Sequence, residues 1–254
     1  MINIIMHGCN GNMGQVITKL VAKDPQMTIV AGIDPNVSAP NPFPVFPSAD
    51  ECTVDADVII DFSTAKAVRP LITFAMSKNI PVVVCTTGLP TEDLDYIKEA
   101  SLSLPVFFSA NMSLGVNLLI GLAKRATEIL SDAGFDIEII EKHHNQKIDA
   151  PSGTALAIAT GINDVLDNQY AYQFDRSTKR EKRPKKEIGI HAIRGGTIVG
   201  EHEVLFAGQD EVITLGHTAT SKEVFAVGAL KAAKFMYKKI QMPGLYNMEH
   251  LIDS

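Results

Sequence analysis

The sequence predicts an α/β fold in which a doubly wound parallel sheet is joined to a smaller α+β domain. Short, continuous apolar runs alternate with helical patterns as far as Phe108, as the strands of a parallel sheet covered on both faces do. The first apolar run leads directly into a glycine-containing turn, GCNGNMG. After Asn111, segments that alternate polar and apolar residues appear, which is typical of antiparallel strands with one face in water.

The first half of the chain contains a regular succession of strands and helices. The segment 35–48 holds five prolines and predicts a loop. Acidic residues at the start of the helical pattern 91–101 suit a helix N-terminus. Apolar runs predict strands at 1–7, 27–33, 57–61, 81–85 and 105–108, and helical spacing predicts helices at 15–22, 65–76 and 91–101.

The second half has a different pattern of apolar and polar residues, which predicts a second domain. A long helical pattern, a strand and a second helix come first, and three strands with alternation and a final helix follow them. The two helices are predicted at 114–130 and 152–166, with the first strand between them at 135–141. The three further strands lie within 188–216, and the final helix is predicted at 222–240. We therefore predict a first domain of residues 1–112, completed by the C-terminal helix region 221–254, and a second domain of residues 113–220.

Composition excludes several classes of function. The chain has 254 residues and a net charge of −6, and this acidic balance argues against a nucleic-acid partner. Cys9, Cys52 and Cys85 lie far apart, so we predict no disulfide framework, no metal site and a reducing compartment. No apolar run reaches membrane-spanning length and no signal peptide precedes the first strand. We expect a soluble, cytoplasmic protein without a membrane partner.

A basic segment is the one feature that could suggest nucleic-acid binding. Lys179–Lys186 reads KREKRPKK, with six basic residues in eight. The rest of the chain is acidic, and no aromatic residues are interleaved with the basic ones. A solvated loop is therefore the preferred interpretation over a nucleic-acid patch.

The glycine turn predicts a Rossmann-like dinucleotide site. Gly8, Gly11 and Gly14 form GxxGxxG between the first strand and the first helix, where a tight turn and close helix packing are needed beside a pyrophosphate. Asn10 stands where the strict fingerprint has its second glycine, and Asn tolerates positive φ better than most residues. Cys9 has no partner residue beside it in the sequence that would make it a nucleophile, so we interpret it as a passive loop residue.

Asp34 ends the second strand, twenty residues after Gly14, where an acid commonly accepts hydrogen bonds from the adenosine ribose. A solvated turn aspartate before Pro35 is the structural alternative. No Lys or Arg occurs between Lys23 and Lys66 to neutralise a 2′-phosphate. We predict that NAD(H) is preferred over NADP(H), whose acceptance the sequence leaves open.

The most informative segment for chemistry is Glu141–Ala155, EKHHNQKIDAPSGTA. His143 can exchange a proton near neutral pH, and His144 and Lys147 add positive charge. Ser152 is a good helix N-cap, and the amides of Gly153 and Thr154 would face a carboxylate at the helix start. Adjacent histidines diverge and lack further ligands at metal spacing. Cationic side chains beside a helix N-terminus therefore predict a site for an anionic dicarboxylate.

With these motifs, the sequence resembles the 4-hydroxy-tetrahydrodipicolinate reductase (dihydrodipicolinate reductase) family essentially over its whole length. The segment above matches the family signature E-x-H-H-x-x-K-x-D-A-P-S-G-T-A. Supporting stretches are GCNGNMG, DFS at 61–63, TTG at 86–88, SANMSLGVN at 109–117 and RGGTIVGEH at 194–202. The resemblance implies NAD(P)H-dependent reduction of a cyclic unsaturated dicarboxylate in the diaminopimelate pathway to lysine, with loss of water, by a homotetramer.

The resemblance also implies roles for individual residues. His143 and Lys147 would be catalytic, the first as proton donor or acceptor and the second as proton donor. His144, Gly153 and Thr154 would hold the substrate carboxylates, in a domain that serves substrate binding and oligomerisation. The cofactor would lie against Gly8, Cys9, Asn10, Gly11, Asn12, Met13, Asp34, Cys85, Thr86, Thr87, Ser109, Ala110, Asn111 and Met112.

Two other functions remain open from the residues alone. The first is another nicotinamide oxidoreductase of similar layout, such as a homoserine or aldehyde dehydrogenase-like enzyme, against which the pairing of HHNQK with PSGT argues. The second is a sensor module that binds NAD without turnover. A sensor would need neither His143 nor Lys147, and it would bind NADH without oxidising it in the presence of substrate.

Overall fold

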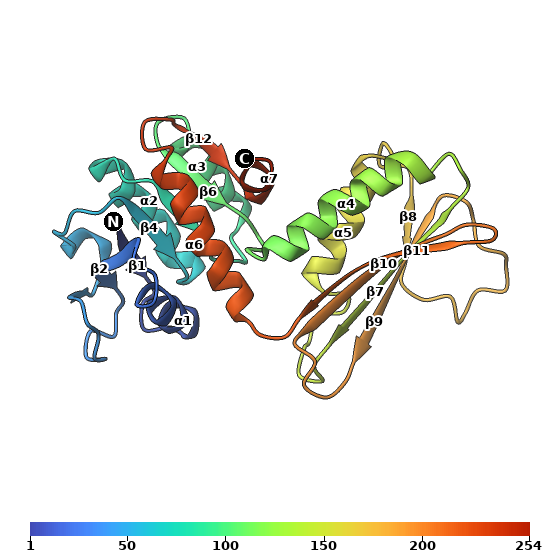
Figure 1. The fold of residues 1–254 in the computed structure, drawn as a ribbon, viewed down its shortest axis with the longest axis horizontal. Coiled ribbons are helices and arrows are strands. Elements are labelled where there is room, and N and C mark those ends of the chain that lie inside the picture. Colours follow the sequence, from blue (N-terminus) through green and yellow to red (C-terminus); the bar gives the residue numbers. More distant parts are fainter. The chain divides into compact units, whose positions relative to one another are not determined.

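The computed structural model describes residues 1–254, which form two compact units (Figure 1). The first unit comprises residues 1–114 and 223–254, and the second comprises residues 115–222. These limits lie close to the domain limits expected from the change of texture after Asn111. No helix in the structure combines the length and the apolar composition that a membrane crossing requires.

The first unit is built on a seven-stranded sheet in which every pair of neighbouring strands is parallel. The order is β12-β6-β5-β4-β1-β2-β3, so the chain moves outward from β1 in one direction and then from β4 in the other. Ligands of such sheets bind where this order reverses, here beside the ends of β1 and β4. The strands are β1 (Ile2–His7), β2 (Met27–Ile33), β3 (Val45–Phe46), β4 (Val58–Asp61), β5 (Val82–Val84), β6 (Pro105–Phe108) and β12 (Gly244–Tyr246).

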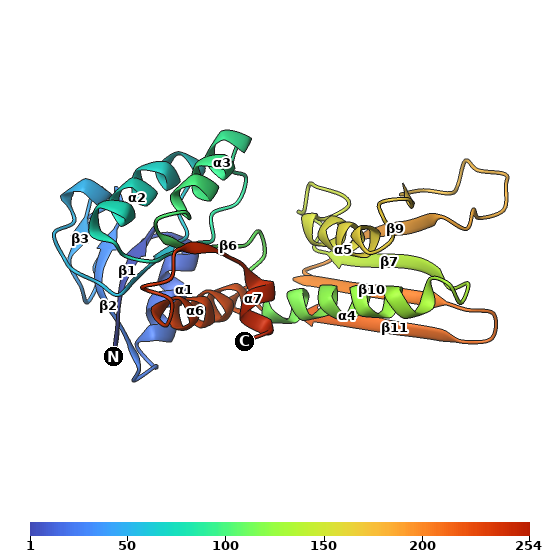
Figure 2. The ribbon, with the colours of Figure 1, turned by 90° about the horizontal axis from the view of Figure 1, so that it is seen from above.

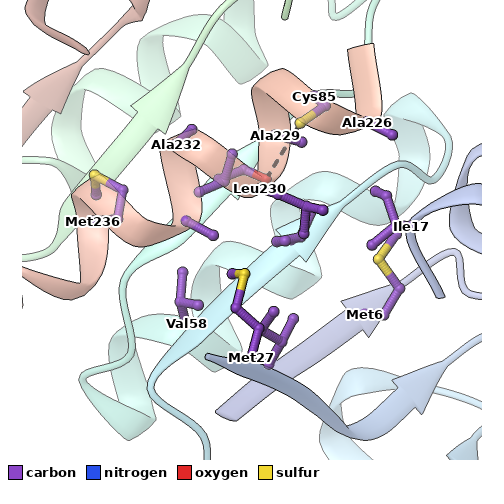
Figure 3. Packing of buried hydrophobic residues seen from close by; sticks show 14 of the residues in the cluster. Met6, Ile17, Met27, Val58, Cys85, Ala226, Ala229, Leu230, Ala232 and Met236 are labelled. Atoms are coloured by element: carbon purple, nitrogen blue, oxygen red, sulfur yellow. Dashed lines mark hydrogen bonds between the residues drawn. The ribbon is translucent and has the colours of Figure 1, made fainter. Parts of the chain in front are cut away.

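Helices cover both faces of this sheet, as the continuous apolar strands predict. One face packs against α1 (Asn12–Val21) and α6 (Glu223–Tyr237), and the other packs against α2 (Ala65–Lys78) and α3 (Thr91–Ala100). Figure 3 shows α6 lying over strand residues such as Met6 and Val58 with Ala226, Ala229 and Ala232. These small side chains allow the helix to approach the sheet closely. The C-terminal α7 (Met248–Ile252) also belongs to this unit.

The second unit consists of a five-stranded sheet in the order β11-β10-β7-β9-β8 with two helices packed on one face (Figure 2). The helices are α4 (Leu114–Leu130) and α5 (Gly153–Asp164). The strands are β7 (Asp136–His143), β8 (Ala171–Gln173), β9 (Glu187–Arg194), β10 (Gly200–Ala207) and β11 (Val212–Ala219). Residues alternate between buried and partly exposed along β7 and β10, which agrees with a sheet covered on one face only.

Some elements differ from the predicted ones. The proline-rich segment 35–48 contains the two-residue strand β3, which pairs with Gly32 and Ile33. The short β8, β12 and α7 were not predicted, because segments of three to five residues carry too little periodicity. The second sheet is mixed rather than antiparallel throughout, since β9 pairs in parallel with both β7 and β8. Only β10 has the predicted antiparallel neighbours, on both of its sides.

The basic segment 179–186 is exposed except at Arg183. Arg183 donates hydrogen bonds to Asp136 and Glu138 on β7 and to the carbonyl of Glu187 on β9. This side chain therefore ties the loop to the second sheet, and the other basic side chains lie in solvent. The arrangement agrees with the solvated-loop interpretation.

Candidate active site

The turn after β1 is shaped by glycines at positions where a side chain has no room. Gly8 has φ of 78°, and a Cβ there would lie 2.4 Å from the carbonyl oxygen of Phe62. At Gly14 a Cβ would lie 2.2 Å from the carbonyl oxygen of Gly8. The first glycine therefore permits the turn, and the third brings α1 against it. Asn10 does not have the positive φ that the sequence allowed for, and instead donates to the carbonyl of Asn36.

The N-terminus of α1 suits a phosphate group. Gly11 is the N-cap, no side chain caps the helix, and its first turn contains no acidic residue. The first backbone N–H groups of a helix and its positive dipole end attract anions. Gly11 and Asn12 are exposed and Met13 is half-buried, so a dinucleotide pyrophosphate fits this turn.

Asp34 lies beside the same turn. Its Oδ2 accepts a hydrogen bond from the Asn10 N–H at 3.0 Å, and its Oδ1 accepts one from the Asn36 N–H at 2.9 Å. Each carboxylate oxygen can accept two hydrogen bonds, so each has capacity for a ribose hydroxyl. Backbone N–H groups thus fix the predicted acid beside the glycine turn.

Two of the predicted cofactor residues are cysteines with buried side chains. A Cβ at Gly32 would lie 2.5 Å from the Cys9 sulfur, which therefore packs beneath the turn. Burial, followed by the charge of Asp34, raises the pKa of Cys9 to about 11. Burial also raises the pKa of Cys85 well above its usual range, and Figure 3 shows its side chain near α6. Both thiols are therefore buried structural groups, and the Cys9 carbonyl is bonded to the Gln15 side chain.

The remaining predicted cofactor residues follow β5 and β6, at the same edge of the sheet as the glycine turn. Thr86 is buried, whereas Thr87 and Ala110 are exposed. The Ser109 hydroxyl donates to the carbonyl of Asn111, and the Asn111 side chain accepts from the Ser113 N–H. Met112 is buried, and its carbonyl packs against α6 at Gly228. A Cβ at Gly228 would lie 1.6 Å from the Met112 carbonyl oxygen.

Asp61 links three strand ends at this edge, a role that its place in the sequence does not indicate. It is fully buried at the end of β4. Its Oδ1 accepts from His7 Nδ1 at 2.7 Å and from the Ser63 hydroxyl at 2.6 Å, and its Oδ2 accepts from the Thr86 hydroxyl at 2.7 Å. A buried charge without partners costs several kcal/mol. The network thus joins the ends of β1 and β4 to Thr86, which lies just after β5.

The second unit brings the predicted catalytic residues to one end of its sheet. His143 is the last residue of β7 and faces the helix side, because it lies two residues after Glu141 in the same strand. His144 and Lys147 follow in the loop. The Lys147 ammonium lies 2.8 Å from a carboxylate oxygen of Asp149, and this interaction lowers the pKa of Asp149.

Glu141 organises this end of the sheet and was missed by the sequence analysis. It is fully buried. Its Oε2 accepts from His143 Nδ1 at 2.6 Å and from Arg194 Nη1 at 2.8 Å, and its Oε1 accepts from Arg194 Nη2 at 2.7 Å and from the Ser152 N–H at 2.9 Å. Although burial opposes it, bonding to Arg194, His143 and Ser152 lowers the pKa of Glu141. The alternation E-x-H was the signal that could have placed Glu141 beside His143.

The N-terminus of α5 faces the same cluster. Ser152 is its N-cap and accepts from the Ala155 N–H, while its hydroxyl also pairs with His202 Nε2 at 3.1 Å. Gly153 is exposed and Thr154 half-buried, with no acidic residue in the first turn. Burial lowers the pKa of His202 to about 4. His202 is therefore neutral at neutral pH, and the His143 ring, whose centre lies 5.2 Å away, lowers the pKa of His202 further.

These two units define a class of protein. A parallel sheet with a glycine turn and an acid at the end of its second strand suits a nicotinamide dinucleotide, and a histidine, a lysine and a helix N-terminus at one end of a second sheet suit an anionic substrate. This is the arrangement of a two-domain nicotinamide-dependent oxidoreductase. Comparison with known proteins identifies the family.

The model of the dihydrodipicolinate reductase N-terminus matches residues 2–112, and that of the C-terminus matches residues 115–252. The 4-hydroxy-tetrahydrodipicolinate reductase of Caldanaerobacter subterraneus subsp. tengcongensis is 56% identical, over 99% of this chain and 98% of the relative. That of Clostridium novyi is 49% identical over 100% and 99%. A dipicolinate-bound dihydrodipicolinate reductase from Paenisporosarcina sp. TG-14 superposes with a TM-score of 0.80 at 27% identity, covering 97% of each chain.

The chain belongs to the dihydrodipicolinate reductase family. Family, fold class and function, a nicotinamide-dependent reductase of the diaminopimelate route to lysine, are thereby confirmed as predicted. The alternative of a binding module without turnover loses its support, since the relatives are named as reductases over the whole chain.

Proposed function

We propose that the chain reduces 4-hydroxy-tetrahydrodipicolinate to tetrahydrodipicolinate with loss of water, holding the nicotinamide dinucleotide on the first unit and the dicarboxylate on the second. The observation that carries the proposal is the group of His143, Lys147 and the α5 N-terminus at one end of the second sheet, around buried Glu141. A bound nicotinamide supplies the hydride. Side chains and backbone amides of the chain bind the substrate and exchange protons with it.

Charge complementarity supports the substrate class. The amides of Gly153 and Thr154 begin α5, where the helix dipole favours an anion. His144 lies on the loop between β7 and α5 and provides a further donor. Lys147 contributes a positive charge from the same loop. These groups hold two carboxylates, and the dipicolinate bound by the Paenisporosarcina relative is a dicarboxylate.

His143 and Lys147 are the residues that we propose to move protons. Hydride addition to the conjugated system leaves negative charge on the substrate, which a nearby acid must neutralise. His143 lies within the buried cluster and has Nδ1 bonded to Glu141. Its Nε2 is therefore the ring atom that can give a proton to the substrate.

Replacing His143 with Ala tests this assignment. General acid catalysis contributes about 10²- to 10⁴-fold, so kcat falls by at least about 100-fold while the Kd for NADH stays within about twofold. The matched control is His191→Ala, a half-exposed histidine of β9 that pairs with Glu138. A folded His143→Ala variant with the kcat of the wild type removes His143 from the reaction.

We propose NAD(H) as the preferred cofactor. Asp34 is held by the N–H groups of Asn10 and Asn36, and its negative charge would repel a 2′-phosphate. No Lys or Arg lies between Lys23 and Lys66 to offset that charge. A KM for NADPH clearly below that for NADH contradicts the proposal.

We propose that the protein acts in the cytoplasm as a homotetramer assembled through the second sheet. In support, β11 is an edge strand with exposed Val212 and Ile213, and natural proteins usually cover such edges. The three cysteines are free thiols, as in a reducing compartment. Sedimentation velocity decides the assembly: a tetramer supports it, and a monomer at micromolar concentration contradicts it.

A further inference from the structure

We propose that Glu141 is a positioning residue that fixes the proton of neutral His143 on Nδ1 and thereby assigns proton exchange to Nε2, and that Arg194 balances its charge. This inference rests on the proposed function for its catalytic consequence. The location of the proton on His143 is inferred separately, from contacts within the second unit.

The hydrogen bonds of Glu141 leave no alternative tautomer. A carboxylate only accepts, and its two oxygens have four lone-pair sites. Four donors meet them: two from Arg194, the Ser152 N–H and His143 Nδ1, at 2.6 to 2.9 Å. Since the pKa of Glu141 is lowered, the group is ionised at neutral pH, and His143 Nδ1 must carry the hydrogen.

The other ring nitrogen lies beside a residue without a side chain. A Cβ at Gly200, the first residue of β10, would lie 3.2 Å from His143 Nε2 and 3.5 Å from its Cδ2. Gly200 therefore keeps the Nε2 edge of the ring uncrowded. When His143 is protonated, Nε2–H is the donor, and after the transfer the neutral ring keeps its proton on Nδ1.

Arg194 extends the same control to the loop that carries Lys147. Both terminal nitrogens of its guanidinium bind Glu141, and Nη2 also donates to the carbonyl of Asp149 at 2.6 Å. Asp149 in turn pairs with Lys147. One buried ion pair thus sets the His143 ring, the start of α5 at Ser152 and the Lys147 loop.

The charged and titratable groups around His143 determine how the variants behave. Glu141 on β7 bonds to His143 directly, and the His202 ring on β10 lies against it. Arg194 on β9 binds Glu141 and the carbonyl of Asp149, which in turn pairs with Lys147. Ser152 adds the uncharged start of α5. Replacing Glu141 removes the negative charge that is bonded to His143. Replacing Arg194 keeps that negative charge but removes the positive charge that balances it.

The experiment measures kcat, KM and their pH dependence for Glu141→Gln and Arg194→Met, together with the tautomer of His143 by ¹⁵N NMR. Glu141→Gln lowers kcat about 10- to 100-fold, as loss of a supporting partner typically does, with the KM for NADH within about twofold. The alkaline limb of the kcat profile moves down by about one pH unit in Glu141→Gln and up in Arg194→Met. In Glu141→Gln the side-chain amide donates to Nδ1, and the proton of neutral His143 moves to Nε2.

The matched control is Glu187→Gln. Glu187 is a buried glutamate at the opposite end of β9 and pairs with Arg176, so its loss perturbs the same sheet without touching His143. Equal losses of kcat in the two glutamine variants, or an Nε2–H tautomer in the wild type, overturn the proposal. The NMR measurement needs neither cofactor nor substrate. A wild-type protein without reductase activity therefore refutes the proposed function alone.

Discussion

Two buried carboxylates, one in each unit, each accept hydrogen bonds from several neighbouring groups. Asp61 binds side chains at the ends of β1 and β4 and after β5, and Glu141 binds groups from β7, β9 and the start of α5. Their neighbours were predictable, because His143 and Lys147 belong to a specific motif. Glu141 opens that motif, but its pairing with Arg194 and the contacts of Asp61 with His7 and Thr86 were not predictable, because these partners lie far away in the sequence.

Burial of His202 makes the stability of the protein depend on pH. The ordinary pKa of 6.5 falls to about 4 in the folded protein. Below pH 6.5 the unfolded chain binds a proton that the folded His202 does not, so the free energy of unfolding decreases towards pH 4, by up to about 3 kcal/mol. This contribution is fully present above pH 6.5.

Urea unfolding at several pH values checks this expectation. The decrease between pH 6.5 and 4.5 is smaller in His202→Gln than in the wild type, and His217, whose pKa burial also lowers, accounts for part of the remainder. His191→Gln, on a half-exposed side chain, keeps the full decrease. An unchanged pH dependence in His202→Gln contradicts the pKa of about 4.

The helices and strands that build the first unit were largely predictable, because fully buried strands of continuous apolar residues are distinctive. The strand runs MINIIMH and MTIVAGI correspond to β1 and β2, and the glycine turn leads into α1 as expected. The short β12 was not predictable, since Gly244–Tyr246 forms a strand only by pairing with β6. In the second unit, alternation indicated the exposure of β10, whereas the parallel pairing of β7 with β9 depends on tertiary contacts.

Replacing Asp61 with Asn tests whether the strand ends of the first unit act together. An amide cannot accept from all of His7, Ser63 and Thr86, so the free energy of unfolding falls by about 2 to 4 kcal/mol, and NADH binds more weakly. Asp57→Asn is the control, because Asp57 accepts from the Asn3 N–H at the opposite end of the same strands. Equal NADH affinities in the two folded variants contradict a role for Asp61 at the cofactor edge.

The molecule as a whole combines two sheets, and the proposed function places the cofactor on the first and the substrate on the second. Each unit has its own hydrophobic core, and each matches its own part of the dihydrodipicolinate reductase family. The change of texture after Asn111 revealed this division in the sequence, because a parallel sheet and a half-exposed sheet require different patterns. The proposals for cofactor preference and assembly rest on the charge of Asp34 and the exposed edge strand β11 rather than on the fold class.

Reductase activity is tested by following the oxidation of NADH and of NADPH with substrate formed in situ from pyruvate and aspartate semialdehyde by the preceding synthase. We expect rapid oxidation that requires the complete mixture, with a lower KM for NADH than for NADPH. Binding of NADH without substrate-dependent oxidation of either nucleotide would contradict it and would indicate a nucleotide-binding module without turnover.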